Sequence, residues 1–294
     1  MLFVISDFFN VIRNMRCPLL KVMSLSLIGV VVTSVAWAQT SVADRRLADI
    51  AMKEERIYKK IAEDPEFYST DDIERHVTDL IGAYSAYLID HPNDVNALIL
   101  YGKLLRRVEQ YEEAFSAFLK ADEIDPNIAV VKQQIGTHLA EGGKAKAALP
   151  FYLRAVELEP ETAVYHFALG QLLQEFRTVY IDDGIFTRDA LEREMLKAFK
   201  KAASLEPEAF DLQMRLGEAY YDLSSPDWKS ALLHWNRMHK EADDPLRVEI
   251  LNLHRARVMG KLGRTNQAIE LARNVQTPSL QKSKQQVLDE IAQH

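Results

Sequence analysis

Apolar residues recur at every third or fourth position through most of the chain from about residue 45 onward, which is the spacing of one face of an α-helix. Two such stripes lie upstream of residue 92, over about 47–61 and 73–88, and they are separated by Asp64-Pro65. A final amphipathic stretch covers about 279–292. The pattern predicts an all-α fold built from many short helices.

Prolines divide this helical pattern at regular distances. Pro92, Pro126 and Pro160 are 34 residues apart, and Pro207 follows 47 residues later, which is one period plus 13. Proline lacks the N–H that a continuing helix needs, so each one marks the end of a helix and the start of the next unit. The spacing predicts a repeated unit of two helices.

Residues of the same kind recur at matching places between the prolines. A glycine lies at position 8 of four units, and most units also have alanine at position 20 and an aromatic residue at position 24. The small residues let two helix backbones approach, and the aromatic ring fills the space beside them. The residues that carry this pattern are Gly102, Ala114 and Phe118; Gly136, Ala148 and Tyr152; Gly170 and Phe199; Gly217, Ala231 and Trp235; and, more weakly, Ala256, Ala268 and Ala272.

This pattern resembles the tetratricopeptide repeat family over about residues 93–275. The resemblance implies a right-handed α-solenoid of antiparallel helix pairs, with copies at about 93–126, 127–160, 161–207, 208–245 and 246–276. Residues 39–92 are predicted to form a divergent first helix pair, and residues 277–294 a C-terminal capping helix. A single helix pair cannot bury its apolar faces, so such copies are expected to stack.

The first 38 residues predict a secretory signal peptide. Basic residues precede a short apolar stretch from Leu25 to Val35, which ends in Ala36-Trp37-Ala38. This order is typical of a cleavable signal, and the apolar run is short for a membrane span, so we expect cleavage after Ala38 and a periplasmic or secreted protein. An uncleaved membrane anchor is the alternative. Translation could begin at Met1, Met15 or Met23, because the segment before Met15 is untypical of a signal peptide.

Charge and cysteine content narrow the function further. The whole chain has a formal net charge of −7, and loss of residues 1–38 removes three basic residues and one acidic residue, which leaves −9. An acidic chain without a basic stripe is a poor nucleic-acid binder. The single cysteine, Cys17, lies within the signal peptide, so no disulfide framework is expected in the mature protein.

The resemblance also implies where a partner would bind. In tetratricopeptide repeats that bind peptides, positions 2, 5, 9, 12 and 13 of the first helix line a concave groove. The corresponding candidates run from basic to acidic along the chain, and each could instead be an ordinary solvated or core residue. They are Asn96, Ile99, Lys103, Arg106, Arg107, Gln133, Thr137, Phe167, Gln171, Gln174, Met214, Glu218 and Tyr221.

The 13-residue insertion in the third copy, within about 175–194, is unusually apolar for a loop. Its candidate contact residues are Phe176, Tyr180, Ile185 and Phe186. Two interpretations stay open: the aromatic residues pack on a neighbouring helix, or the segment contacts a partner. The run Asp182-Asp183-Gly184 indicates a turn, since a calcium loop would need more oxygen ligands at alternating positions.

No catalytic, phosphate-binding or metal-binding motif is present, and the eight histidines are scattered. We therefore expect no catalytic residue, no cofactor and no metal. The leading hypothesis is a non-catalytic scaffold of the bacterial cell envelope that binds a polypeptide of unknown identity. The alternative is a structural or glycan-associated envelope protein that uses the aromatic insertion, Trp228 and Trp235, although Trp235 occupies the packing position 24. An enzyme is the third possibility.

Overall fold

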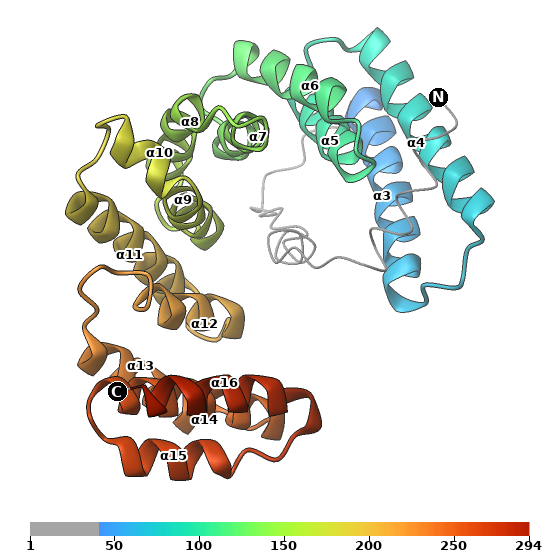
Figure 1. Cartoon of the computed structure of the whole chain (residues 1–294). Helices are drawn as coiled ribbons and strands as arrows, with labels where there is room; N and C mark the ends of the chain where they lie inside the picture. The colour runs from blue at the N-terminus through green and yellow to red at the C-terminus, as the bar shows by residue number, and fades with distance from the viewer. Residues whose placement is uncertain (1–40, 294) are drawn as a thin grey trace. The chain divides into compact units, whose positions relative to one another are not determined.

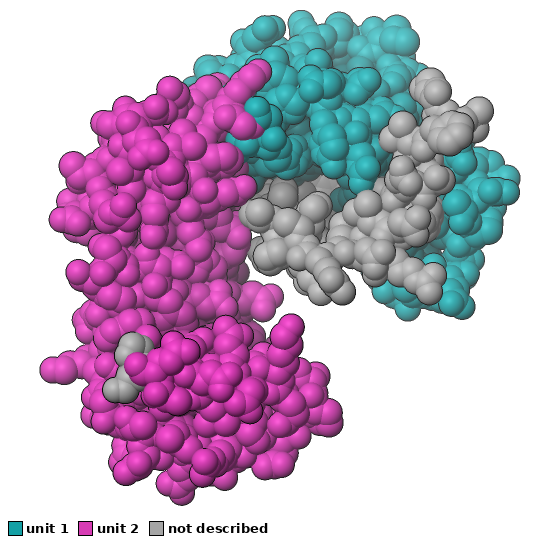
Figure 2. All heavy atoms as spheres, in the orientation of Figure 1, with its two compact units in different colours: residues 1–142 teal, residues 143–294 magenta. Residues whose placement is uncertain are grey.

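The computed structural model describes residues 41–293. The predicted signal peptide and its cleavage position lie outside the described residues. The chain divides into two compact units, residues 1–142 and 143–294, which are coloured separately in Figure 2. The described residues form fourteen α-helices and one short 3-10 helix and contain no β-strand, so the all-α prediction is confirmed.

The described part of the first unit consists of five helices that pack in chain order (Figure 1). Its first two helices begin with a capping box: Ser41 caps with Asp44, and Ser69 caps with Asp72, so the side chains satisfy backbone N–H groups that the helix itself leaves unpaired. The five helices are α3 (Val42–Glu63), α4 (Thr70–Asp90), α5 (Val95–Arg107), α6 (Tyr111–Ile124) and α7 (Ala129–Glu141).

Close approach of α5 and α6 depends on Gly102. A Cβ atom at this glycine would lie 2.8 Å from the Phe118 ring, which is almost completely buried. The repeat pattern predicted this small-against-large contact. Leu80, Tyr84 and Tyr87 form a core between α3, α4 and α5, so residues 42–90 are a helix pair packed on the first repeat.

The second unit contains the remaining helices. They are α8 (Ala145–Leu158), α9 (Ala163–Glu175), α10 (Arg177–Asp182), α11 (Arg188–Leu205), α12 (Phe210–Ala219), α13 (Trp228–Glu241), α14 (Pro245–Lys261), α15 (Thr265–Arg273), the 3-10 helix η1 (Pro278–Leu280) and α16 (Gln281–Ala292). Helix α9 packs on α11, α14 packs on α13 and α15, and α16 covers α14 and α15 (Figure 1).

The same small-against-large contact recurs in this unit. A Cβ atom at Gly170 would lie 2.8 Å from the Phe199 ring, and one at Gly217 would clash with the Trp235 ring. Both rings are buried. At the end of the array, the Gly260 backbone lies close to Ile291 of α16, which closes the apolar core. None of the helices in residues 41–293 is both long enough and apolar enough to cross a membrane.

The turn between the two helices of a copy also repeats. Gly143 lies between α7 and α8 with a φ of 71°, and Gly263 lies between α14 and α15 with a φ of 74°. The residue 34 positions before Gly143 is Glu109, between α5 and α6, and its φ is 62°. The turn geometry is therefore kept in the first copy although the glycine is not.

Candidate partner-binding faces

Each repeat copy has a first helix, which is α5 or α7 in the first unit and α9, α12 or α14 in the second. The side chains at the predicted groove positions of these helices form what we call the first-helix face of the unit. The structure buries three of these predicted residues. Ile99, Gln133 and Phe167 are at most 9% exposed, because they pack against the neighbouring helices. A partner could touch them only after the core repacks.

Arg107 binds within its own unit. Its Nη1 donates to Glu54 Oε1 at 3.0 Å, and its guanidinium lies 4.0 Å from the centre of the Tyr58 ring. Glu54 is 9% exposed and its other oxygen accepts from the Tyr84 hydroxyl at 2.8 Å. Burial raises the pKa of Glu54, while the Tyr84 hydrogen bond and the Arg107 charge act in the opposite direction. Arg107 thus ties α5 to α3.

Arg106 ties α5 to α7 in the same way. Its two terminal nitrogens donate to Glu141 at 3.1 and 2.8 Å, which is a bidentate pair. On α7, Gln133 and Thr137 bond to each other, since the Gln133 amide donates to the Thr137 hydroxyl at 3.5 Å. These predicted groove residues of the first unit are therefore engaged with their own chain.

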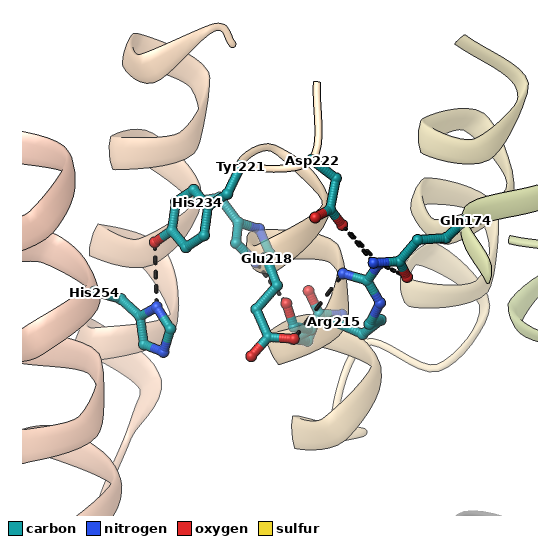
Figure 3. A network of polar contacts seen from close by, with 8 residues as sticks. Gln174, Arg215, Glu218, Tyr221, Asp222, His234 and His254 are labelled. Atoms are coloured by element: carbon teal, nitrogen blue, oxygen red, sulfur yellow. Dashed lines mark hydrogen bonds and ion pairs between the residues drawn. The ribbon is translucent and has the colours of Figure 1, made fainter. Parts of the chain in front are cut away.

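In the second unit, Arg215 organises the first-helix face, as Figure 3 shows. Its Nη2 donates to the Gln174 side-chain oxygen and, at 2.8 Å, to Asp222 Oδ2. The Gln174 amide donates to the same Asp222 oxygen at 2.9 Å. The guanidinium also lies 4.3 Å from the centre of the Phe199 ring. Gln174 is therefore held in one orientation by α12 and by the turn that follows it.

Tyr221, in the turn after α12, joins that turn to α14. Its hydroxyl is 3.1 Å from His254 Nδ1 (Figure 3). His254 also stacks on Trp235, with ring centres 4.2 Å apart. Burial, and then the neighbouring Arg257 charge, lower the pKa of His254 to about 4. The imidazole is therefore neutral at pH 7. The Trp228 ring lies 5.9 Å from the Tyr221 ring, so Trp228 belongs to the same aromatic group.

Glu218 and Arg257 complete this face. Arg257 donates from Nε and Nη2 to the two carboxylate oxygens of Glu290 on α16, at 2.7 and 3.2 Å. Glu218 lies 4.0 Å from Arg215 Nη1, and 47% of its side chain is exposed. Burial raises the pKa of Glu218 and outweighs the effect of Arg215, and Asp222 raises it further.

The remaining candidates differ in what surrounds them. Gln171 on α9 and Met214 on α12 are half-buried, and Asn96 at the start of α5 is exposed. Lys103 is also exposed and forms no hydrogen bond or ion pair with any residue in 41–293. Desolvation of its ammonium group, and then the Arg107 charge, lower the pKa of Lys103. Lys103 is thus the predicted cation of α5 that a partner can reach without breaking an existing pair.

Of the predicted contact residues in the insertion, Tyr180 packs most fully against its own unit. Tyr180 is fully buried, and its hydroxyl donates to the Ala145 carbonyl oxygen at 2.9 Å. Phe186 is partly buried, with its ring 6.1 Å from that of Tyr180, and Phe176 lies at the junction of α9 and α10. Ile185 is 40% exposed. The structure therefore assigns Tyr180 to the core and leaves Ile185 at the surface.

Three residues that shape this face of the second unit are absent from the sequence-based candidates, namely Arg215, His254 and Arg257. Arg257 directly follows Ala256, the position-8 residue of the fifth copy, so it occupies position 9 there. The rule that selected Glu218 in the fourth copy would therefore have found it. Arg215 and His254 both lie two residues before position 8 of their copies, outside the five groove positions, and no signal in the repeat pattern points to them.

Within 41–293, no group of three His, Cys, Asp or Glu side chains is placed to hold a metal ion. His234, which is buried, bonds through Nε2 to the Gln213 carbonyl oxygen at 2.8 Å, and it therefore has a structural role.

Comparisons with known proteins agree with the fold. Residues 95–128, which contain α5 and α6, match the family model described as tetratricopeptide repeat. The crystal structure of PilW, a widely conserved type IV pilus biogenesis factor, is similar with a TM-score of 0.54 at 12% identity, and the match covers 82% of this chain and 98% of that one. Residues 95–128 therefore contain a tetratricopeptide repeat, and the described residues have the fold of paired helices seen in such proteins.

Two further structures are similar at lower scores. MamA 41-end from Desulfovibrio magneticus RS-1 has a TM-score of 0.47 at 19% identity, covering 70% of this chain and 99% of that chain. YrrB, described as a TPR protein with an unusual peptide-binding site, has a TM-score of 0.43 at 20% identity, covering 65% of this chain and 94% of that chain. No curated protein matches the chain.

Proposed function

We propose that this chain is a non-catalytic scaffold, exported to the bacterial cell envelope, that binds a partner polypeptide on the first-helix faces of its repeats. The observation that carries the proposal is the first-helix face of the second unit. Gln171, Met214, Glu218 and Tyr221 remain partly exposed there, while the opposite sides of the same helices are buried in the core. Polar groups beside a few apolar ones on a rigid repeat surface suit an extended or helical peptide.

The arrangement of the fixed side chains supports binding over catalysis. Arg215 and Arg257 are held by carboxylates, and the His254 imidazole stacks on Trp235 beside Tyr221. These contacts pre-order the surface, which lowers the entropy that a bound partner must offset. For the glycan-associated alternative, Tyr180 of the insertion is buried and offers no ring face to a sugar.

Site-specific photocrosslinking tests the proposal. In one variant, a photoreactive amino acid replaces Gln171 on α9. In the control variant, it replaces Leu233 on α13, the second helix of its copy, where the side chain is 73% exposed. Both variants are irradiated in cells that produce the full chain. We expect one polypeptide to crosslink from position 171 and not from position 233. Equal crosslinking from both positions, or none from position 171, would overturn the proposal.

Export is tested separately. N-terminal sequencing of the chain recovered from the envelope fraction is expected to begin at Gln39. Recovery of an uncleaved chain in the membrane fraction would favour the anchor alternative, and recovery from the cytoplasm would refute export.

A further inference from the structure

The carboxylates that contact Arg215 and Arg257 in the second unit outnumber these two cations. Two cations, Arg215 and Arg257, lie among three carboxylates, those of Asp222, Glu290 and Glu218. Arg215 pairs with Asp222 at 2.8 Å and Arg257 pairs with Glu290 at 2.7 Å. Glu218 is left with a contact of 4.0 Å to Arg215, and that distance is too long for a hydrogen bond.

Glu218 also lies where a partner can reach it. Nearly half of its side chain is exposed, and its carboxylate accepts no side-chain hydrogen bond from any residue in 41–293. It occupies position 9 of the fourth copy, the place that Gln171 takes in the third copy and Arg257 takes in the fifth. The neighbouring Tyr221 ring is partly exposed and can contact the alkyl chain of a basic side chain.

We propose that this face binds a polypeptide segment that presents a lysine or arginine, whose cation pairs with Glu218. The inference rests on the proposed function and names the chemistry of its partner. Charge complementarity supports this inference. Among these five charged groups, the Glu218 carboxylate is the one without a hydrogen-bonded partner, and a cation from the bound segment would neutralise it. The same cation would be repelled at Lys103 of the first unit, so this specificity belongs to the second unit.

The physical cost of leaving Glu218 without such a partner points the same way. Partial burial disfavours its charged form, and Asp222 adds to that penalty. A bound cation would offset both effects. An apolar or amide side chain at this position would avoid the penalty in the free protein but would lose the interaction with the partner.

A displayed library of random peptides, selected on the purified full chain, is the probe. We expect the enriched peptides to share a lysine or arginine. For one such peptide, Glu218→Gln is expected to raise Kd about tenfold, as loss of one partly exposed charged hydrogen bond would. Glu270→Gln on α15, also an exposed glutamate, should leave Kd unchanged.

A charge swap makes the test specific. Glu218→Lys should abolish binding of the basic peptide and restore binding to a peptide in which the lysine is replaced by glutamate. Enriched peptides without a basic residue, or a Kd unaffected by Glu218→Gln, would overturn this inference while leaving peptide binding itself intact. A library that enriches nothing would count against both this inference and the proposed function.

Discussion

Glu192 of α11 accepts two hydrogen bonds from Ser224, one from the backbone N–H at 2.9 Å and one from the hydroxyl at 2.8 Å. Glu192 belongs to the insertion of the third copy. Ser224 lies in the turn between α12 and α13, which is lengthened because Gly217 and Ala231 are 14 residues apart, whereas Gly102 and Ala114 of the first copy are 12 apart. Arg177 makes a parallel link, because its Nη2 donates to the Asp222 carbonyl oxygen at 2.6 Å. The two departures from the regular repeat are therefore bonded to each other.

Substitution of Glu192 should loosen this link. Glu192 is 7% exposed, and charged hydrogen bonds contribute more than neutral ones, so we expect Glu192→Ala to lower the free energy of unfolding by about 2 kcal/mol. Glu192→Gln, which keeps one acceptor oxygen, should cost less. Urea unfolding of the purified chain measures both. Glu194→Gln, on the same helix and exposed, serves as the control, and an equal effect there would contradict the assignment.

The left-handed turn at Glu109 predicts a stabilising substitution. Glu109 has a φ of 62° where two other copies have glycine, and a side chain in this region is strained. We expect Glu109→Gly to raise the free energy of unfolding by about 0.5–1 kcal/mol. Gly143→Ala, with the reverse change at a φ of 71°, should lower it by about 1 kcal/mol. Thermal unfolding of both variants tests these two predictions. If both substitutions changed the free energy of unfolding in the same direction, the inference that the two copies share this turn geometry would be refuted.

Much of this fold could be predicted from the sequence because packing repeats with the period. The contact of Gly217 with Trp235 follows from the small residue at position 8 and the aromatic residue at position 24. The ion pairs do not follow, since Arg107 meets Glu54 across 53 residues and outside the repeat register. The packing of Tyr180 does not follow either, because an aromatic residue in a loop has no periodicity that distinguishes a core position from a surface one.

His254 predicts how stability depends on pH. Its pKa is lowered from 6.5 to about 4, so the unfolded chain takes up this proton first as the pH falls. The folded state therefore loses stability from about pH 6.5 downward, on the order of 2 kcal/mol by about pH 4.5. We expect His254→Phe, which keeps the stacking on Trp235, to remove that part of the acid sensitivity in urea unfolding measured across this pH range.

Tyr221→Phe is the matched control for this measurement. It removes the hydrogen bond between Tyr221 and His254 but leaves the imidazole able to titrate. The pH dependence of its unfolding should therefore stay like that of the unmodified chain. Because burial also lowers the pKa values of His234 and His239, some acid sensitivity should remain in His254→Phe. Identical pH profiles for His254→Phe and the unmodified chain would contradict the prediction.

Glu218 is expected to weaken the fold while it serves binding. Burial raises its pKa, so the folded state favours the protonated form, and the ionised carboxylate lowers stability once the pH rises above the ordinary glutamate value. Arg215 and Asp222 on its own repeat and Arg257 on α14 are the charged groups that act on it. At pH 7, Glu218→Gln should therefore raise the free energy of unfolding, on the order of half a kcal/mol because the side chain is half exposed.

The difference between Glu218→Gln and the unmodified chain should disappear as the pH falls below the ordinary glutamate value of 4.5, where both side chains are neutral. Urea unfolding at about pH 7 and about pH 4 measures this. Substitution of a residue that serves only packing would lower the stability of the protein. Substitution of a residue that serves partner binding can raise the stability of the protein while it lowers the affinity for the partner. If Glu218→Gln is less stable than the unmodified chain at pH 7, the carboxylate has a structural partner, and its proposed role in binding a cation loses its main physical support.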